Sequence, residues 1–227
     1  MNIPDIIIAV DGYSSTGKSS FAKLVAKKFG FTYLDSGALY RGVTLFAQEE
    51  GLISKIGRIS PALEGALASL DLHFEQGTRT FMGQRCIEDR IRTMEVSSQV
   101  SPIAALPYVR AFVDAKLHAM AAGGRVVMDG RDIGTTVFPN AELKIFMTAS
   151  PEVRAKRRFD ELAAKGEHPI YEEVLENLRE RDYMDSHRET SPLVRAADSF
   201  ELDNSEMTMD QELAWIQGLI QGKFGIL

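Results

Sequence analysis

Eight residues near the N-terminus have the types and spacing needed to bind the phosphates of a nucleotide, and they read Gly12-Tyr13-Ser14-Ser15-Thr16-Gly17-Lys18-Ser19. They match the pattern GxxxxGK[ST], in which glycines let backbone amides turn toward an anion, the lysine reaches the outer phosphates and the last hydroxyl ligates Mg²⁺. An apolar run at residues 6–10 precedes the segment, and an apolar helical pattern at residues 21–29 follows it. The helix would add the positive end of its dipole. This context predicts a phosphate-binding loop rather than a glycine-rich turn that matches by chance.

A second group of candidate residues, Asp129-Gly130-Arg131-Asp132, follows a buried-type strand pattern at residues 125–128. An aspartate that ends such a strand is the expected carboxylate for holding Mg²⁺ through water in a phosphoryl-transfer site. A turn built on the Asp-Gly pair is the alternative interpretation. A turn, however, requires neither Arg131 nor Asp132.

Arginines recur in loops and helix ends that flank the expected strands, although the chain as a whole is acidic. Phosphoryl transfer needs cations around the transferred group, and the planar guanidinium fork suits phosphate oxygens. Taken singly, each could be an ordinary solvated surface charge. The set comprises Arg41, Arg110, Arg131, Arg154, Arg157, Arg158, Arg181 and Arg188.

The stretch from Arg154 to Arg181 is dense in charge and is interrupted by Gly166-Glu167-His168-Pro169. Two charged helices joined by a flexible tip predict a lid, which would close over the nucleotide and exclude water as a competing acceptor. The alternative is an exposed helical hairpin with no catalytic role. Three arginines on the first of these helices favour the lid.

The elements that must position these residues alternate between strands and helices along most of the chain. Strand patterns at residues 31–34, 125–128, 143–147 and 199–203 alternate with helical patterns, which predicts a mostly parallel sheet covered by helices on both faces. The segment at about 61–95 differs, because short alternating stretches at 72–75, 79–82 and 86–88, with a turn at 76–78, predict a small antiparallel sheet. We therefore expect an α/β fold of the P-loop kinase type. It would be one domain (1–227) with a core (1–60, 96–153 and 184–227), an insertion (about 61–95) and a lid (about 154–183).

Composition narrows the possible functions. The chain has 227 residues, 44% hydrophobic and 26% charged, with a net charge of −6, which argues against a surface that coats nucleic acid. The single cysteine, Cys86, allows no internal disulfide and no thiolate metal site, and the four histidines lack ligand spacing. We expect neither a signal peptide nor a membrane-spanning helix. We expect a cytoplasmic monomer that binds small nucleotides and neither nucleic acid nor membrane.

The combined motifs resemble bacterial cytidylate kinases, in which ATP phosphorylates cytidine monophosphate (CMP), over residues 8–203. The most specific stretches are Leu34-Asp35-Ser36-Gly37-Ala38-Leu39-Tyr40-Arg41, Ile91-Arg92-Thr93, Asp129-Gly130-Arg131-Asp132-Ile133-Gly134-Thr135 with Val137-Phe138-Pro139, and Arg179-Glu180-Arg181-Asp182 through Asp185 and Arg188. The phosphate-binding loop alone indicates only a nucleotide. The two aspartate-led stretches together indicate the cytidylate kinase family.

The resemblance implies a role for particular residues. CMP or deoxycytidine monophosphate (dCMP) would be bound by Ser36, Arg41, Ser101, Arg110, Arg131, Asp132, Arg181, Asp185 and Arg188. Among them, Ser101, Arg110 and Asp185 would recognise the base and sugar, whereas Arg41, Arg131 and Arg188 would surround the acceptor phosphate. The small-sheet insertion would close on the monophosphate.

The same residues define an expected mechanism of direct in-line transfer from ATP·Mg²⁺, with no covalent intermediate. ATP would be held by Gly12, Tyr13, Ser14, Ser15, Thr16, Gly17, Lys18, Ser19, Ser20, Arg154, Arg157 and Arg158. Ser19 would ligate the metal directly and Asp129 through water. The residues expected to act in catalysis are Lys18, Asp129, Arg131 and Arg188.

Two features limit the resemblance. Similar enzymes usually carry proline at the position of Tyr13 and threonine at that of Ser20, so the resemblance does not predict the local shape of the loop. The acceptor could also be another small molecule, such as uridine monophosphate (UMP), shikimate or a nucleoside. A non-catalytic GTP-binding module is the other alternative, but it would need an Asn-Lys-x-Asp segment that this sequence lacks.

Overall fold

The computed structural model describes residues 3–75 and 79–226 and divides the chain into two compact units. The first unit comprises Met1–Tyr33 and Gly123–Leu227, and the second comprises Leu34–Ala122. The turn predicted at residues 76–78 lies outside the described residues. The boundaries proposed above for a core, an insertion and a lid stay a prediction.

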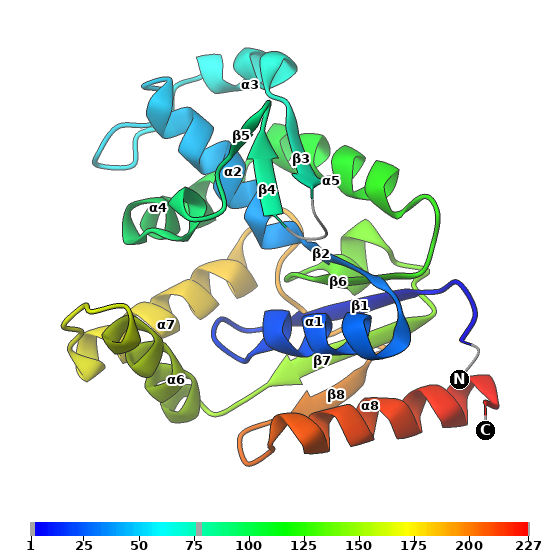
Figure 1. Cartoon of the computed structure of the whole chain (residues 1–227). Helices are drawn as coiled ribbons and strands as arrows, with labels where there is room; N and C mark the ends of the chain where they lie inside the picture. The colour runs from blue at the N-terminus through cyan, green and yellow to red at the C-terminus, as the bar shows by residue number, and fades with distance from the viewer. Residues whose placement is uncertain (1–2, 76–78, 227) are drawn as a thin grey trace. The chain divides into compact units, whose positions relative to one another are not determined.

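The first unit is built around a five-stranded sheet with the strand order β2-β6-β1-β7-β8 (Figure 1). Its strands are β1 (Ile7–Gly12), β2 (Thr32–Asp35, which crosses the boundary between the units), β6 (Val126–Asp129), β7 (Leu143–Thr148) and β8 (Phe200–Asp203). Strand β1 pairs in parallel with β6 and with β7, and β7 pairs in parallel with β8. The predicted mostly parallel sheet is confirmed.

One face of this sheet is covered by α1 (Lys18–Phe29) and α8 (Met209–Phe224), which lie side by side (Figure 1). Phe21 and Val25 of α1 and Ile216 and Ile220 of α8 are fully buried in the same apolar core. Each such side chain contributes about 1.5–3 kcal/mol by leaving water. The central strand reads as a continuous apolar run because strands buried on both sides need no polar alternation.

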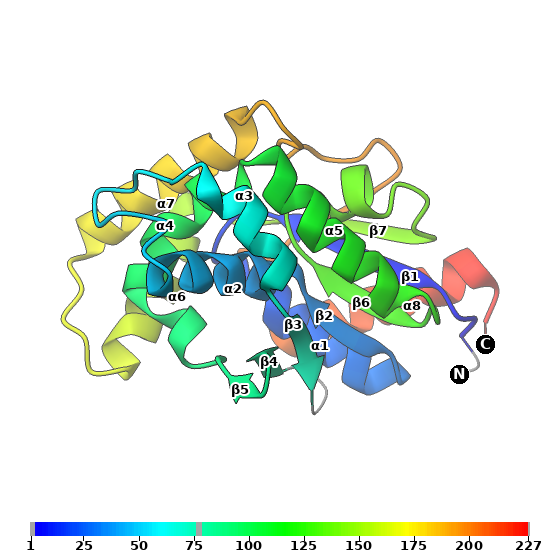
Figure 2. The ribbon, with the colours of Figure 1, turned by 90° about the horizontal axis from the view of Figure 1, so that it is seen from above.

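Local sequence signals set the ends of the helices in this unit. Gly30 follows the apolar helical pattern directly, as a C-cap glycine should; it ends α1 at a φ of 72°, and its N–H donates to Ala26. Ser150 caps α6 (Pro151–Ala164), and Thr208 forms a reciprocal capping box with Gln211 at the start of α8. Helices α6 and α7 (Tyr171–His187) lie side by side, as both Figure 1 and Figure 2 show. These two helices are the charged pair that the sequence predicted.

The second unit combines helices with a small sheet. Helices α2 (Ser36–Glu49), α4 (Met94–Ala104) and α5 (Pro107–Ala121) pack on one another, and α2 and α5 lie side by side (Figure 2). Strands β3 (Leu72–Glu75), β4 (Arg79–Met82) and β5 (Arg85–Cys86) form an antiparallel sheet, confirming the predicted small sheet. The unit also contains α3 (Ala62–Ala66) and two short turns, η1 (Leu67–Ser69) and η2 (Arg90–Arg92).

Two predicted elements of this unit are shorter than expected. The strand predicted at 86–88 ends at Cys86: Ile87 still donates to Thr80, but its carbonyl accepts from Ile91 because the chain turns there into η2. Residues 62–70 have a helical pattern in the sequence, but α3 ends at Ala66 and the chain tightens to a 3₁₀ turn from Leu67 onward. Among the described residues, no helix combines the length and the apolar character that crossing a bilayer would require.

Candidate active site

The phosphate-binding loop follows β1 directly, and α1 begins at its lysine, Lys18. Three loop residues have positive φ angles, namely Gly12 (147°), Ser15 (58°) and Gly17 (91°). A Cβ atom at Gly12 would lie 2.1 Å from the backbone oxygen of Met147, so only glycine fits there. Ser15 adopts the left-handed conformation without being glycine, a local strain of the kind that persists at functional loops.

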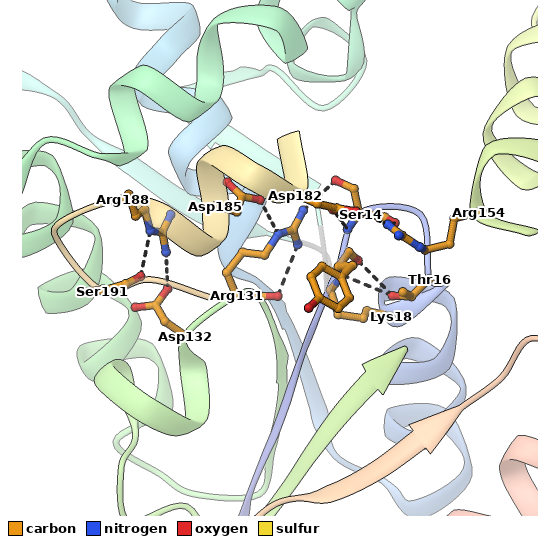
Figure 3. A network of polar contacts seen from close by, with 12 residues as sticks. Ser14, Thr16, Lys18, Arg131, Asp132, Arg154, Asp182, Asp185, Arg188 and Ser191 are labelled. Carbon is orange, nitrogen blue, oxygen red and sulfur yellow. Dashed lines mark hydrogen bonds and ion pairs between the residues drawn. The ribbon is translucent and has the colours of Figure 1, made fainter. Parts of the chain in front are cut away.

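Lys18 is buried, and its ammonium group lies within the loop (Figure 3). It donates to the carbonyl of Tyr13 and to the hydroxyl of Thr16, the latter at 3.4 Å. Burial and the nearby charge of Arg131 lower the pKa of Lys18 well below its usual value. An anionic phosphate would oppose both effects, because it would replace neutral oxygen acceptors with a charged one.

Asp129 ends β6 beside the phosphate-binding loop. Its two carboxylate oxygens accept from the Ser19 hydroxyl at 2.8 Å and from the Tyr33 hydroxyl at 2.6 Å. A hydroxyl and a carboxylate at hydrogen-bonding distance are oxygen ligands that suit Mg²⁺, which is usually held by few protein groups together with water and substrate phosphates. In the described part of the chain no three His, Cys, Asp or Glu residues form a metal cage. The residues present fit a metal that arrives with a nucleotide.

Arg131 connects the phosphate-binding loop to α7 (Figure 3). Its Nη2 donates to the Ser14 hydroxyl at 2.9 Å, and its Nε donates to Asp185 at 2.8 Å. Burial by itself would raise the pKa of Asp185, but the charges of Arg131, Arg181 and Arg188 lower it below its usual value. Asp185 therefore remains ionised and holds the guanidinium of Arg131 in place.

Arg154 of α6 forms a second connection to the same loop. It donates to the Ser14 carbonyl at 3.2 Å and pairs with Asp182 of α7, which also accepts from the Ser14 amide at 3.4 Å (Figure 3). Its guanidinium lies 5.2 Å from the centre of the Tyr13 ring, and this ring meets Phe146 edge to face. The tyrosine that replaces the usual proline thus packs against a predicted ATP-binding arginine.

The other two arginines of α6 behave differently from each other. Arg157 donates to the Thr16 carbonyl at 3.2 Å and to Asn204, which itself donates to Thr16 at 2.8 Å. Arg158 pairs with Glu161 along its own helix. The structure thus brings two of the three predicted lid arginines to the phosphate-binding loop and directs the third along α6. Ser20 lies on the exposed side of the first turn of α1.

The remaining predicted residues of the first unit lie where α7 ends. Arg188 donates to Asp132 at 3.2 Å and to the carbonyl of Ser191 at 2.8 Å (Figure 3). Arg181 lies on α7 one turn before Asp185. Arg131 and Arg188 are therefore both paired with carboxylates, Arg131 with Asp185 and Arg188 with Asp132.

Predicted residues of the second unit form their own arrangement. Asp35 accepts from the Ala38 amide at 2.9 Å and pairs with Arg41 at 3.1 Å and with Arg92 at 2.7 Å. It thereby caps α2 and orients Arg41, whereas Ser36 is buried in the first turn of the same helix. Arg110 of α5 is 3% exposed, lies 5.4 Å from the Tyr40 ring and donates to Ala104. Ser101 lies half-buried on α4.

Sequence reasoning missed several residues of the first unit that support the site. Tyr33, Asn204 and Asp11 were not singled out, since their partners lie far away in sequence. Asp182 falls within one of the motifs quoted above but received no role. That position, next to Arg181 and one helical turn before Asp185, is the one signal that would have found it.

A phosphate-binding loop after the central strand of a parallel sheet, and a carboxylate at the end of the neighbouring strand, define a P-loop kinase. The comparisons narrow this class. The family model described as cytidylate kinase matches residues 8–221. A cytidylate kinase from Bacteroides thetaiotaomicron is 49% identical over 216 residues, covering 93% of this chain and 94% of its own, and one from Parabacteroides distasonis is 50% identical with the same coverage. The chain belongs to the cytidylate kinase family.

A structural comparison adds only the fold. A crystal structure of an uncharacterized protein from Eubacterium ventriosum matches with a TM-score of 0.50 at 10% identity, covering 95% of this chain and 98% of that one. The arrangement of strands and helices is therefore shared well beyond recognisable sequence similarity.

Proposed function

We propose that this protein transfers the γ-phosphoryl group of ATP to the 5′-phosphate of CMP and dCMP. Within its family, the observation that carries the proposal is the position of Arg131. Its guanidinium bonds Ser14 of the phosphate-binding loop on one side and Asp185 of α7 on the other. A cation between a donor loop and predicted acceptor residues is what a reaction between two anionic phosphates requires.

On the donor side, we assign the phosphates of ATP to the loop residues from Gly12 to Ser20, with Lys18 as the principal cation. Arg154 and Arg157 support this assignment because both already contact carbonyls of the loop. Arg158 would have to leave Glu161 to take part. We also assign Mg²⁺ to Ser19, with Asp129 acting through water. When bound, the metal would supply positive charge to the phosphate oxygens.

On the acceptor side, we assign residues from each unit separately. From the first unit, Arg131 and Arg188 would hold the acceptor phosphate, while Asp132, Arg181 and Asp185 would meet the nucleoside. From the second unit, Arg41 would hold the phosphate, while Ser36, Ser101 and Arg110 would recognise the nucleoside. Hydroxyl, guanidinium and carboxylate groups match the donors and acceptors of cytosine and ribose.

The reaction requires the protein mainly to position the two phosphates and to neutralise their charge. The attacking oxygen of a monophosphate is already anionic, so no strong general base is needed. Arg131 and Arg188 would neutralise the acceptor, which lowers the repulsion between two like-charged groups as they approach. Lys18 would stabilise the negative charge on the phosphoryl group during its transfer.

The test is ADP formation from ATP and Mg²⁺ with CMP, dCMP, UMP, AMP and GMP offered separately. We expect strong preference for CMP and dCMP. We also expect Arg131→Ala to lose about a thousandfold in kcat/KM, because removing a transition-state arginine typically costs that much. The matched control is Arg195→Ala, since Arg195 is an exposed arginine paired with Glu201. Equal turnover of UMP, or an unimpaired Arg131→Ala variant, would contradict the proposal.

A further inference from the structure

Asp11 is a buried carboxylate in β1, immediately before the phosphate-binding loop. It is 5% exposed, and its two oxygens accept from the backbone amides of Ile133 and Gly134, each at 2.7 Å. Both amides lie 122 or more residues away in sequence. One side chain therefore joins two loops that the chain does not connect locally.

The loop that Asp11 holds is the one that carries Arg131 and Asp132. It continues as a short π-helical turn, η3 (Ile133–Val137), whose first two amides are those that Asp11 accepts. Gly134 is wedged in this turn: a Cβ there would lie 3.1 Å from the side chain of Lys144 and 3.3 Å from the carboxylate of Asp11. A side chain at residue 134 would therefore press against Lys144 and Asp11, and one of them or the turn would have to move by a few tenths of an ångström.

Asp11 therefore fixes the relative position of two functional segments, the phosphate-binding loop and the loop that carries Arg131. The residue after Asp11 is Gly12, which opens the phosphate-binding loop, and the residues before Ile133 are Arg131 and Asp132. The Arg131–Ser14 hydrogen bond spans the same two loops at 2.9 Å. A shift of the η3 turn would therefore move Arg131 relative to Lys18 and Ser14.

We propose that Asp11 is a positioning residue for phosphoryl transfer, one that fixes the distance between the donor loop and the arginine of the acceptor loop. The inference rests on the function proposed above and extends it to a residue that contacts neither substrate. Its importance would lie in alignment, because in-line transfer depends on placement to within a fraction of an ångström.

A carboxylate is a costly choice for packing alone. Burial raises the pKa of Asp11 to about 6, against the lowering effect of the two amides, and the neighbouring charge of Asp132 raises it further while that of Lys18 lowers it. A neutral side chain would fill the same space at less cost. Two acceptor oxygens for two adjacent amides are what an aspartate supplies and an asparagine does not, since the asparagine NH₂ donates only.

The experiment compares three variants of the full chain. Asp11→Asn leaves one amide of the turn unpaired, and Gly134→Ala crowds the turn against Asp11 and Lys144 from the other side. The control, Lys144→Met, keeps a long side chain against Gly134 but removes the bonds from its ammonium group to Pro139, which follows η3, and to Asp198, which precedes β8. For each protein, kcat, both KM values and the melting temperature would be measured.

We expect Asp11→Asn and Gly134→Ala to lower kcat roughly ten- to a hundredfold, with both KM values within about threefold of wild type, because misalignment acts on the transition state more than on binding. Lys144→Met should keep kcat while losing at least as much thermal stability as Asp11→Asn. The inference is overturned if Asp11→Asn retains its kcat, or if kcat of all three variants falls in step with their melting temperatures. Should Asp11→Asn not fold, Gly134→Ala decides in the same way. A wild-type chain that phosphorylates no monophosphate would instead refute the function itself, and the inference with it.

Discussion

Two buried carboxylates, one in each unit, both accept hydrogen bonds from backbone amides, but their surroundings shift their pKa values in opposite directions. Asp11 in β1 and Asp35 at the end of β2 are each 5% exposed, and each accepts backbone amides of the turn or helix that it positions. For Asp11, burial outweighs its hydrogen bonds and raises its pKa to about 6. Burial would likewise raise the pKa of Asp35, but the charges of Arg41 and Arg92 reverse the effect and lower it.

This difference separates a carboxylate that stabilises the fold from one that is tolerated at a cost. The amides hold Asp11 in place but do not replace the water that an ion loses on burial. Asp35 is both a helix cap and the shared partner of two guanidinium groups. We expect its ionised form to contribute to stability, whereas the ionised form of Asp11 should reduce it.

The largest expected loss of stability follows the replacement of Asp35. Replacing it with alanine removes the cap of α2 and the carboxylate that Arg41 and Arg92 share, although Arg92 keeps its pair with Glu88; the loss should be about 3–4 kcal/mol of unfolding free energy. Thr93→Ala is the matched control, because Thr93 caps α4 through its hydroxyl and should cost about 1 kcal/mol. Denaturant titration measures both. Equal losses for the two variants would mean that the ion pairs add nothing to the cap.

The second prediction concerns pH and has a definite sign. The folded-state pKa of Asp11 exceeds its unfolded value of 3.8, so wild type loses stability as the pH rises from about 4 to about 6 and then levels off. A rise of about two pKa units corresponds to about 3 kcal/mol. Measured against Asp11→Asn, wild type should therefore lose this amount between pH 4 and pH 7.5.

Asp35 supplies the opposite case for the same measurement. Its folded-state pKa lies below its unfolded value, so the stability it contributes is present above pH 4 and is lost only as the pH falls further. The difference in stability between wild type and Asp35→Asn should stay constant from pH 4.5 to pH 7.5. Parallel pH profiles for the two pairs of proteins would refute the comparison.

The smallest expected loss of stability is for Asp182, a carboxylate of the first unit that, unlike Asp11, forms an ion pair with an arginine. Asp182 pairs with Arg154 over the phosphate-binding loop, but it is partly exposed and caps no helix. Asparagine keeps an oxygen that can accept from Arg154, so Asp182→Asn should lower the unfolding free energy by about 1–2 kcal/mol. Steady-state kinetics should show the KM for ATP rising roughly threefold to tenfold, because Arg154 loses its orientation.

The KM for CMP is the internal control for that variant and should change little. A fall in the KM for ATP would show instead that Asp182 competes with the nucleotide for Arg154. In that case Asp35 would orient its arginine, whereas Asp182 would hold Arg154 away from the nucleotide.

Much of this architecture could be predicted from the sequence because its signals are local. The apolar runs, the charged helix pair and the alternating stretches of the small sheet each depend on neighbours within a few residues, and all of them appear in the structure. Asp129 was predicted beside Ser19 from its place at the end of a strand, and the two side chains are hydrogen-bonded. Parallel strands bring such ends together whatever lies between them in the chain.

What the sequence did not reveal depends on distant partners. Asp11 reads as one more residue of a strand until the amides of Ile133 and Gly134 are placed beside it. Asn204 bonds the backbone of Thr16 across 188 residues, and nothing in its immediate neighbours indicates that contact. The direction of Arg158 along α6 toward Glu161 is likewise a matter of side-chain geometry, which helical periodicity alone leaves open.

The tyrosine of the phosphate-binding loop has a consequence for which substitutions the loop can accept. Its ring lies beneath Arg154 and against the edge of Phe146, so this one side chain contacts both α6 and β7. Replacing Tyr13 with the proline usual among similar enzymes would remove both contacts at once. Residues 13, 146 and 154 therefore form a coupled set, in which the effect of changing one position depends on which side chains occupy the other two.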